Sequence, residues 1–141
     1  MISWGVVLLW LALIFCLSHQ PVTESKGLST GVAEVVMQAV EQVAPAADLD
    51  INRVDHLVRK NAHFFVYLVL GALMLNALRR SGMTGIKSVG LAMLLCLLYA
   101  ISDEVHQTFV PGRGGQVEDV LLDSMGAAIG IGAYLLVRKK D

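Results

Sequence analysis

The residues of this chain that could carry out chemistry are ionisable side chains beside long apolar segments. One set recurs every four positions, so that a helix would align its members in a single stripe: Asp55, Arg59, His63 and Tyr67, with Lys60 one position over. Carboxylates and imidazoles are common general acids and bases, and guanidinium and ammonium groups pair with phosphates and carboxylates. The stripe is therefore suited either to proton transfer or to binding an anion.

Two further polar sets stand at the ends of later apolar segments. Three residues spaced to share one helix face close the third segment: Asp103, Glu104 and Gln107. Asp119 and Asp123 lie one turn apart at the start of the fourth segment, after a turn-forming Pro-Gly-Arg-Gly-Gly loop that presents Arg113. Ionisable groups at membrane depth are costly and normally face a bundle interior or a water-filled cavity. We therefore expect the sets to converge in one functional site; ion pairs that only fix the helix register are the alternative.

Metal ligands and reactive cysteines are not predicted. His63 with Asp103 or Glu104 could bind a metal ion, but the HExxH and HxxEH spacings that would support such a site are missing. Cys16 and Cys96 lie in apolar runs without a CxxC partner, so neither a disulfide nor a zinc site is implied. We expect no cofactor.

Composition and patterning place these residues in a membrane protein. The 141 residues are 55% hydrophobic and 16% charged with a formal net charge of -1, which argues against disorder and against a nucleic-acid binder. Uncharged runs cover residues 1–20, 61–78, 88–102 and 124–137. A bilayer core of about 30 Å needs about 20 mostly apolar helical residues. We predict one all-α domain, 1–141, an integral membrane four-helix bundle with spans at 3–18, 60–80, 87–107 and 118–138.

Basic residues set the predicted orientation of the spans. Arg79, Arg80 and Lys87 lie between the second and third spans, and residues 138–140 near the C-terminus are all basic. The positive-inside rule then places both termini in the cytoplasm and the polar sets outside. The first run has no early basic residue and no small-x-small cleavage signal, so we expect it to be retained as a span.

The first outer connection, residues 21–55, contains a predicted amphipathic helix. Its apolar residues recur at helical spacing: Val32, Val35, Val36, Ala39, Val40 and Val43. The polar face lacks the Lys and Arg that anionic lipids attract, so we favour a helix that covers the outer mouth of the bundle over one that lies on the membrane. A further helix is expected to begin near Asn52 and to continue into the second span.

Small residues indicate where helices pack closely. Gly126, Gly130 and Gly132 in the fourth span are spaced for close helix approach in lipid. We favour packing within the bundle over dimerisation, because such patterns occur at any helix contact. Gly71 and Gly90 are expected to play similar packing roles.

Four segments, in order, resemble the motifs of the VanZ-like membrane proteins. They are residues 15–21 (Phe-Cys-Leu-Ser-His-Gln-Pro), 59–64 (Arg-Lys-Asn-Ala-His-Phe), 102–113 (Ser-Asp-Glu-Val-His-Gln-Thr-Phe-Val-Pro-Gly-Arg) and 119–127 (Asp-Val-Leu-Leu-Asp-Ser-Met-Gly-Ala). Asp123 and His19 depart from the pattern, since many relatives have Asn and Ser there. The resemblance implies a small multi-pass protein of the bacterial cytoplasmic membrane, related to the glycopeptide-resistance protein that lowers susceptibility to teicoplanin.

Three functions fit the residues together with this resemblance. A binding protein would hold an anionic headgroup, of a membrane lipid or a lipid-linked cell-wall precursor, through a set of contacts formed by Arg59, Lys60, Tyr67, Gln107, Arg113, Asp119 and Asp123. An enzyme acting on such a ligand would use Asp103 or Glu104 as general base and His63 as an acid or base. A structural protein would use the same residues only to hold the helices together.

Binding is favoured over catalysis because no activated nucleophile stands beside the polar sets. Ser102 and Ser124 are the nearest hydroxyls, and neither lies in a nucleophile-elbow or Ser-x-x-Lys context.

Overall fold

Four helices of the chain are long and apolar enough to cross a membrane. The computed structural model describes residues 2–19, 22–43 and 51–138, which form five α-helices and no strand. The helices are α1 (Ile2–His19), α2 (Val22–Val43), α3 (Ile51–Arg80), α4 (Gly85–Gln107) and α5 (Val117–Arg138). The candidate spans are α1, α4, α5 and the Leu57–Arg80 part of α3, which confirms the predicted all-α membrane fold and its four spans.

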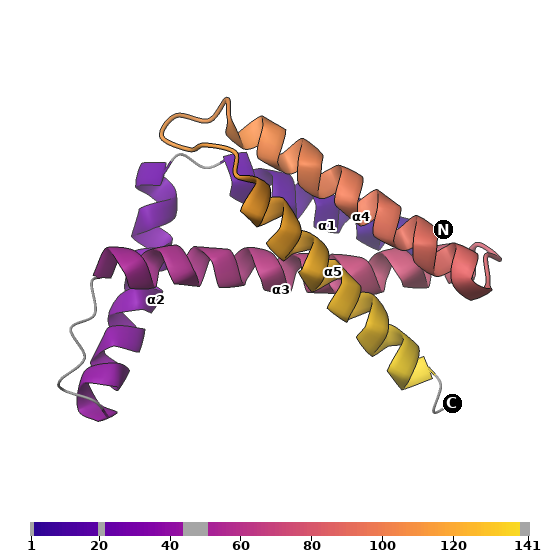
Figure 1. Cartoon of the computed structure of the whole chain (residues 1–141), viewed down its shortest axis with the longest axis horizontal. Coiled ribbons are helices and arrows are strands. Elements are labelled where there is room, and N and C mark those ends of the chain that lie inside the picture. The colour runs from indigo at the N-terminus through magenta and orange to yellow at the C-terminus, as the bar shows by residue number, and fades with distance from the viewer. Residues whose placement is uncertain (1, 20–21, 44–50, 139–141) are drawn as a thin grey trace.

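Helix α3 is the axis around which the other helices pack (Figure 1). Helix α5 crosses it with the largest interface of the molecule, and α1 and α4 also pack against it. The ends of α1 and α4 and the beginnings of α3 and α5 come together at one end of the bundle. The polar sets of the sequence all lie in these parts of the helices, so the fold brings them to the same end.

The buried face of α4 explains why its acids are inside the protein. Small residues recur every four positions along this face: Ser88, Ala92, Cys96 and Ala100. The same stripe continues into Asp103, Glu104 and Gln107, which are also buried. The neighbouring face, which carries Leu94 and Leu98, is exposed on the outside of the bundle. The carboxylates are therefore on the interior side of a helix whose small residues let its neighbours approach.

Glycines set the distance between α3 and α5. A Cβ atom at Gly126 would collide with the carbonyl of Phe64, and one at Gly130 with the carbonyl of Leu68. From the other side, a Cβ atom at Gly71 would collide with the backbone of Ala127. These contacts confirm close packing within the bundle.

Two other glycines do not take part in such contacts. A Cβ atom at Gly90 or at Gly132 would meet nothing within 4 Å. The expected packing role of Gly90 is therefore wrong for this bundle, because its position on α4 faces away from the neighbouring helices.

Helix α2 confirms a helix in the first connection, but its contact face differs from the predicted one. It packs across the first part of α3, with Ala33 fully buried. Val32, Val35 and Val36 remain exposed, so the valine face does not cover the mouth of the bundle. Ala33 is thus the buried residue of α2, whereas Val40 is half-buried.

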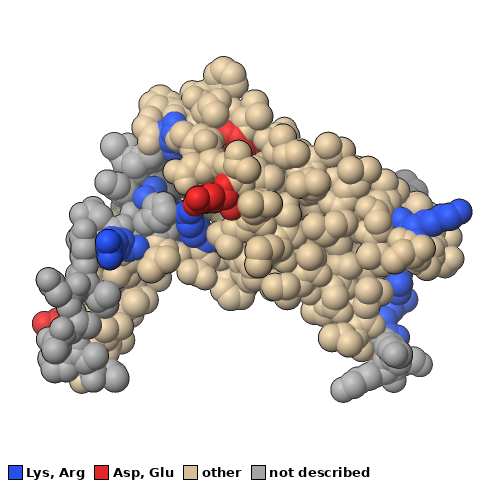
Figure 2. All heavy atoms as spheres, viewed as in Figure 1, with Lys and Arg blue, Asp and Glu red and all other residues tan. Residues whose placement is uncertain are grey.

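The two ends of the bundle differ in the charges that they carry. Near the α3–α4 turn and the end of α5, the described charged residues are all basic, namely Arg79, Arg80, Lys87 and Arg138. On the face seen in Figure 2, the coloured groups at that end are all basic, and the visible acidic groups lie on the other part of the molecule. The charge asymmetry used for the orientation is thus preserved in three dimensions.

Candidate functional site

Buried polar side chains from α1, α4 and α5 meet at the acidic end of the bundle. Among the described residues, the buried polar and charged ones at this end are Ser18, Asp103, Glu104, Gln107 and Asp123. Burial of a polar group costs free energy unless it is hydrogen-bonded, and burial of a charge costs more unless it is paired. Each of these side chains therefore needs a partner or a ligand.

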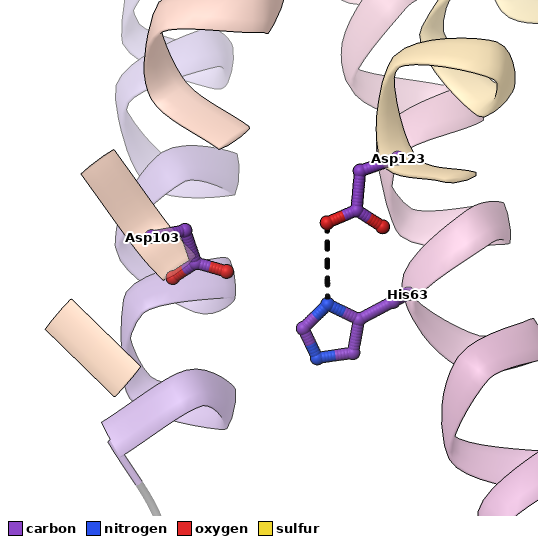
Figure 3. Close-up of side chains that lie close together, drawn as sticks. All are labelled: His63, Asp103 and Asp123. Carbon is purple, nitrogen blue, oxygen red and sulfur yellow. Dashed lines mark ion pairs between the residues drawn. The ribbon is translucent and has the colours of Figure 1, made fainter. Parts of the chain in front are cut away.

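The centre of the site is formed by His63, Asp103 and Asp123. Figure 3 shows their side chains directed toward a shared space from three different helices. One nitrogen or oxygen atom from each lies within 4.8 Å of the others. Nδ1 of His63 is 3.7 Å from Oδ2 of Asp123, which is within ion-pair range but too long for a hydrogen bond. We call these residues the His–Asp cluster.

Asp103 is held in place by the first helix. The hydroxyl of Ser18 donates a 2.8 Å hydrogen bond to Oδ2 of Asp103, and both side chains are buried. Ser18 was missed in the sequence analysis. The available signal was its spacing, since it lies four residues after the buried Ile14 on the same face of α1.

Several polar atoms in the cluster lack a partner. Asp123 and Tyr67 are both 0% exposed, yet neither oxygen of Asp123 nor the hydroxyl of Tyr67 has a hydrogen-bond partner among the described residues. Tyr67 lies one turn after His63 on α3, and its phenol interacts electrostatically with Asp103 and Asp123. An unsatisfied buried polar group costs about 1–3 kcal/mol, so this arrangement calls for a ligand or a functional reason.

Glu104 anchors the loop between α4 and α5. The backbone amide of Gln116 donates a 2.9 Å hydrogen bond to Oε2 of Glu104. Gly115 lies so close to α4 that an added Cβ atom would be 2.8 Å from the carbonyl oxygen of Glu104. Glu104 was a candidate general base, and the structure gives one of its oxygens this positioning role.

Three cations surround the cluster. They are Arg59, Lys60 and Arg113, which we call the cationic rim. Nζ of Lys60 lies 2.9 Å from Oδ1 of Asp119 and 4.0 Å from Oε2 of Glu118. These pairs connect α3 to the start of α5.

Arg113 lies in the loop at residues 108–116 and is only partly exposed. Burial, followed by the positive charge of Arg59, lowers the pKa of the Arg113 guanidinium, while the charges of Asp103 and Glu104 oppose this shift. Two guanidinium groups are thus held within electrostatic reach of one another. Such a pair is well suited to an anion that bridges them.

His19 and His106 form a second pair that no sequence argument used. Nδ1 of His19 is 3.1 Å from Nε2 of His106, and the ring of Phe15 packs against both imidazoles. These residues connect the ends of α1 and α4 at the surface, beside the buried site. The spacing of Phe15 and His19 by one helical turn was the signal available for this contact.

The site residues named from the sequence all lie at one end, but in two layers. Tyr67, Asp103 and Asp123 form the interior. The His63 side chain is 26% exposed, and Lys60 and Asp119, with the same exposure, pair at the rim. Gln107 is buried on the α4 face that carries Asp103. The functional roles assigned to these residues stay predictions.

Comparison with known proteins adds one decisive match. A model of the VanZ/LLP1 family matches residues 3–138. The chain belongs to the VanZ/LLP1 family. The matched segment contains α1 from its second residue onward, all of α2 to α5, and all residues of the His–Asp cluster and the cationic rim. The search of curated proteins and the search of solved structures each found no significant match.

Membership of the VanZ/LLP1 family agrees with the resemblance drawn from the motifs, and the chain is a multi-pass membrane protein. The motif residues of this VanZ/LLP1 chain can now be assigned to places in the structure. Those at 59–64, 102–113 and 119–127 contribute the His–Asp cluster, the rim and the loop between α4 and α5.

Proposed function

We propose that this VanZ/LLP1 protein binds the anionic headgroup of a lipid-linked molecule at its cationic rim. The observation that carries the proposal is the position of Arg59 and Arg113, two half-buried guanidinium groups within electrostatic reach of each other; burial, followed by the charge of Arg59, lowers the pKa of Arg113. Like charges held together repel, and a phosphate or diphosphate between them would remove that repulsion through charge-assisted hydrogen bonds. Lys60, one position from Arg59, adds a third cation at the same level.

The rim is proposed to face the outer leaflet of a bacterial cytoplasmic membrane, with both termini in the cytoplasm. Support comes from the opposite end of the bundle, where Arg79, Arg80, Lys87 and Arg138 would lie on the cytoplasmic side under the positive-inside rule. In this orientation the ligand is a membrane lipid or a lipid-linked cell-wall precursor. Sequestering such a precursor would change susceptibility to glycopeptides such as teicoplanin.

An enzyme acting on the same headgroup is the second candidate. The unpartnered atoms of Asp123 and Tyr67 favour it, because active sites keep buried polar groups unsatisfied for use in a reaction. Asp103 would be the general base in this case, since it lies beside His63 and Asp123, whereas Glu104 holds the loop through Gln116. His63 would supply or remove the second proton.

A lipid-binding titration tests the proposal. The protein is placed in zwitterionic nanodiscs and titrated separately with a polyprenyl diphosphate and with phosphatidylglycerol. Arg113→Gln should weaken binding of the preferred lipid at least about tenfold, the effect of losing about 1.4 kcal/mol. Arg80→Gln, at the other end of the bundle, is the matched control. Equal affinities of the two variants would contradict the proposal.

A second measurement separates binding from catalysis. Asp103→Asn should leave headgroup binding within a few-fold of the wild type if the protein only binds, and should abolish turnover with binding retained if it is an enzyme. Teicoplanin susceptibility of cells that express wild type or Arg113→Gln at matched protein levels tests the cellular role.

A further inference from the structure

We propose that His63, Asp103 and Asp123 bind a divalent transition-metal ion, with Zn²⁺ preferred. The three side chains come from α3, α4 and α5 and face a common space (Figure 3). One potential ligand atom from each lies within 4.8 Å of the other two. Metal bonds of about 2.0–2.2 Å in a tetrahedral site place ligand atoms about 3.4 Å apart, so small side-chain rotations would complete the geometry.

The contact between His63 and Asp123 already has the spacing of two ligands on one ion. Nδ1 and Oδ2 are 3.7 Å apart, longer than a hydrogen bond and close to the edge of a zinc tetrahedron. A direct hydrogen bond would have drawn the two atoms to about 2.9 Å. The geometry therefore fits an ion between them better than a shared proton.

Charge and burial support the same assignment. Asp103 and Asp123 are nearly or fully buried, and both oxygens of Asp123 lack hydrogen-bond partners among the described residues. Buried charges in proteins are normally paired or coordinate metals. Two carboxylates and a neutral imidazole carry two negative charges, which one divalent cation balances. The buried hydroxyl of Tyr67, also unpartnered, lies one turn from His63 and within electrostatic reach of both carboxylates.

A supporting residue orients one of the proposed ligands. Ligating carboxylates are commonly hydrogen-bonded by outer groups that fix their orientation. Ser18 does this for Asp103 through its 2.8 Å hydrogen bond to Oδ2. The hydrogen bond to Asp103 thus explains why a serine is buried at the end of the first candidate span.

The donor set selects the class of ion. Mg²⁺ and Ca²⁺ prefer oxygen ligands alone, whereas an imidazole nitrogen with carboxylates suits Zn²⁺ and neighbouring transition metals. Three protein ligands leave a fourth position open for water or substrate. If the headgroup proposal holds, a phosphate oxygen is the natural fourth ligand, because Arg113 interacts with Asp103. Binding of the ion itself does not depend on that proposal.

Metal binding can be tested without any lipid ligand. Protein in detergent is treated with chelator, dialysed and titrated with Zn²⁺, Mn²⁺ or Mg²⁺, with calorimetry and Tm as readouts. The wild type should bind one equivalent of Zn²⁺ and gain Tm, because a ligand that binds only the folded state stabilises it. Co²⁺ should give the visible absorption of a tetrahedral site.

Three variants identify the ligands. Asp123→Asn should abolish the Zn²⁺-induced rise in Tm, and Ser18→Ala should weaken Zn²⁺ binding about 10–100-fold. Glu118→Gln, on the same helix with a side chain that is 85% exposed, should bind like wild type. If Asp123→Asn does not fold, His63→Gln replaces it.

The metal-free proteins separate a metal site from a purely structural cluster. Metal-free Asp123→Asn should be close in stability to metal-free wild type, because the substitution removes a buried carboxylate that accepts no hydrogen bond and loses only the 3.7 Å ion pair with His63. Equal Zn²⁺ affinity for wild type and Asp123→Asn, or no Tm shift of the wild type with Zn²⁺, would overturn the proposal. A larger shift with Mg²⁺ than with Zn²⁺ would overturn the choice of ion.

Discussion

Gly130 of α5 rests directly on the backbone carbonyl of Leu68 in α3, with no room for a methyl group between them. One turn earlier, Gly126 makes the same kind of contact with Phe64, the residue next to His63. Asp123 precedes Gly126 on the same side of α5, so these contacts also set the distance between Asp123 and His63. The glycine contacts that set the packing of α5 against α3 therefore also position the residues of the candidate site.

Gly130→Ala should destabilise the bundle by about 1–3 kcal/mol, the usual cost of inserting a methyl group into a well-packed interface. The control is Gly132→Ala on the same helix, where an added Cβ atom meets nothing within 4 Å. Thermal unfolding in detergent measures both variants. Comparable Tm values for the two would mean that the close contact between α3 and α5 does not exist.

Gly115→Ala should disturb the cationic rim without unfolding the protein. Its new Cβ atom would be 2.8 Å from the carbonyl oxygen of Glu104 and 2.9 Å from Cγ2 of Thr108, so the loop must move away from α4. This movement would strain the hydrogen bond from Gln116 and shift Arg113. We expect weaker binding of anionic lipid by Gly115→Ala.

Gly114→Ala is the neighbouring control for the loop, because its added methyl group would have no atom within 4 Å. Its lipid affinity should equal that of wild type in the same nanodisc titration. A loss of affinity in Gly114→Ala as large as in Gly115→Ala would point to loop flexibility rather than to the contact with α4.

Lys60→Gln separates a binding role of the rim from a structural one. The pair between Lys60 and Asp119 is partly exposed at 2.9 Å, so its loss should lower the free energy of unfolding by less than about 1 kcal/mol. Affinity for the anionic headgroup should fall nonetheless, and Lys60→Arg should restore much of it. Lys87→Gln at the opposite end serves as control. A large drop in Tm with unchanged affinity would favour a cluster that only pins the helices.

The orientation predicts which loops a membrane-impermeant thiol reagent reaches in intact cells. With Cys16 and Cys96 replaced by Ala, a cysteine at Gly114 should be labelled from outside, and one at Thr84 only after permeabilisation. Both positions are exposed in loops at opposite ends of the bundle. Labelling of the Thr84 variant in intact cells would reverse the proposed topology.

The spans could be predicted from the sequence because the thickness of the bilayer sets the length of the uncharged run that a spanning helix needs. The burial of Asp103 could also be expected, since it continues the small-residue face of α4 through Ala92, Cys96 and Ala100. Periodicity gives the faces of each helix. It does not give the rotation of one helix against another.

That missing rotation accounts for what the sequence did not reveal. The pairing of His63 with Asp123 depends on contacts at Gly126 and Gly130, and the bond from Ser18 depends on where α1 docks. In α2, which packs against α3, Ala33 is fully buried while Val32, Val35 and Val36 are exposed. No local sequence motif predicts that one His and two Asp come together as ligands, since each comes from a separate helix.

Helix α3 has 30 residues, which corresponds to a length of about 45 Å, whereas the hydrocarbon core is about 30 Å thick. Its apolar part is Leu57–Arg80, so in the proposed membrane placement the turns before it, against which α2 packs, extend into the headgroup layer. Arg59 and Lys60 stand at the transition between the two zones. If the proposed headgroup binding holds, a lipid diffusing sideways would meet them at the depth of its own phosphate, with its acyl chains still in the bilayer.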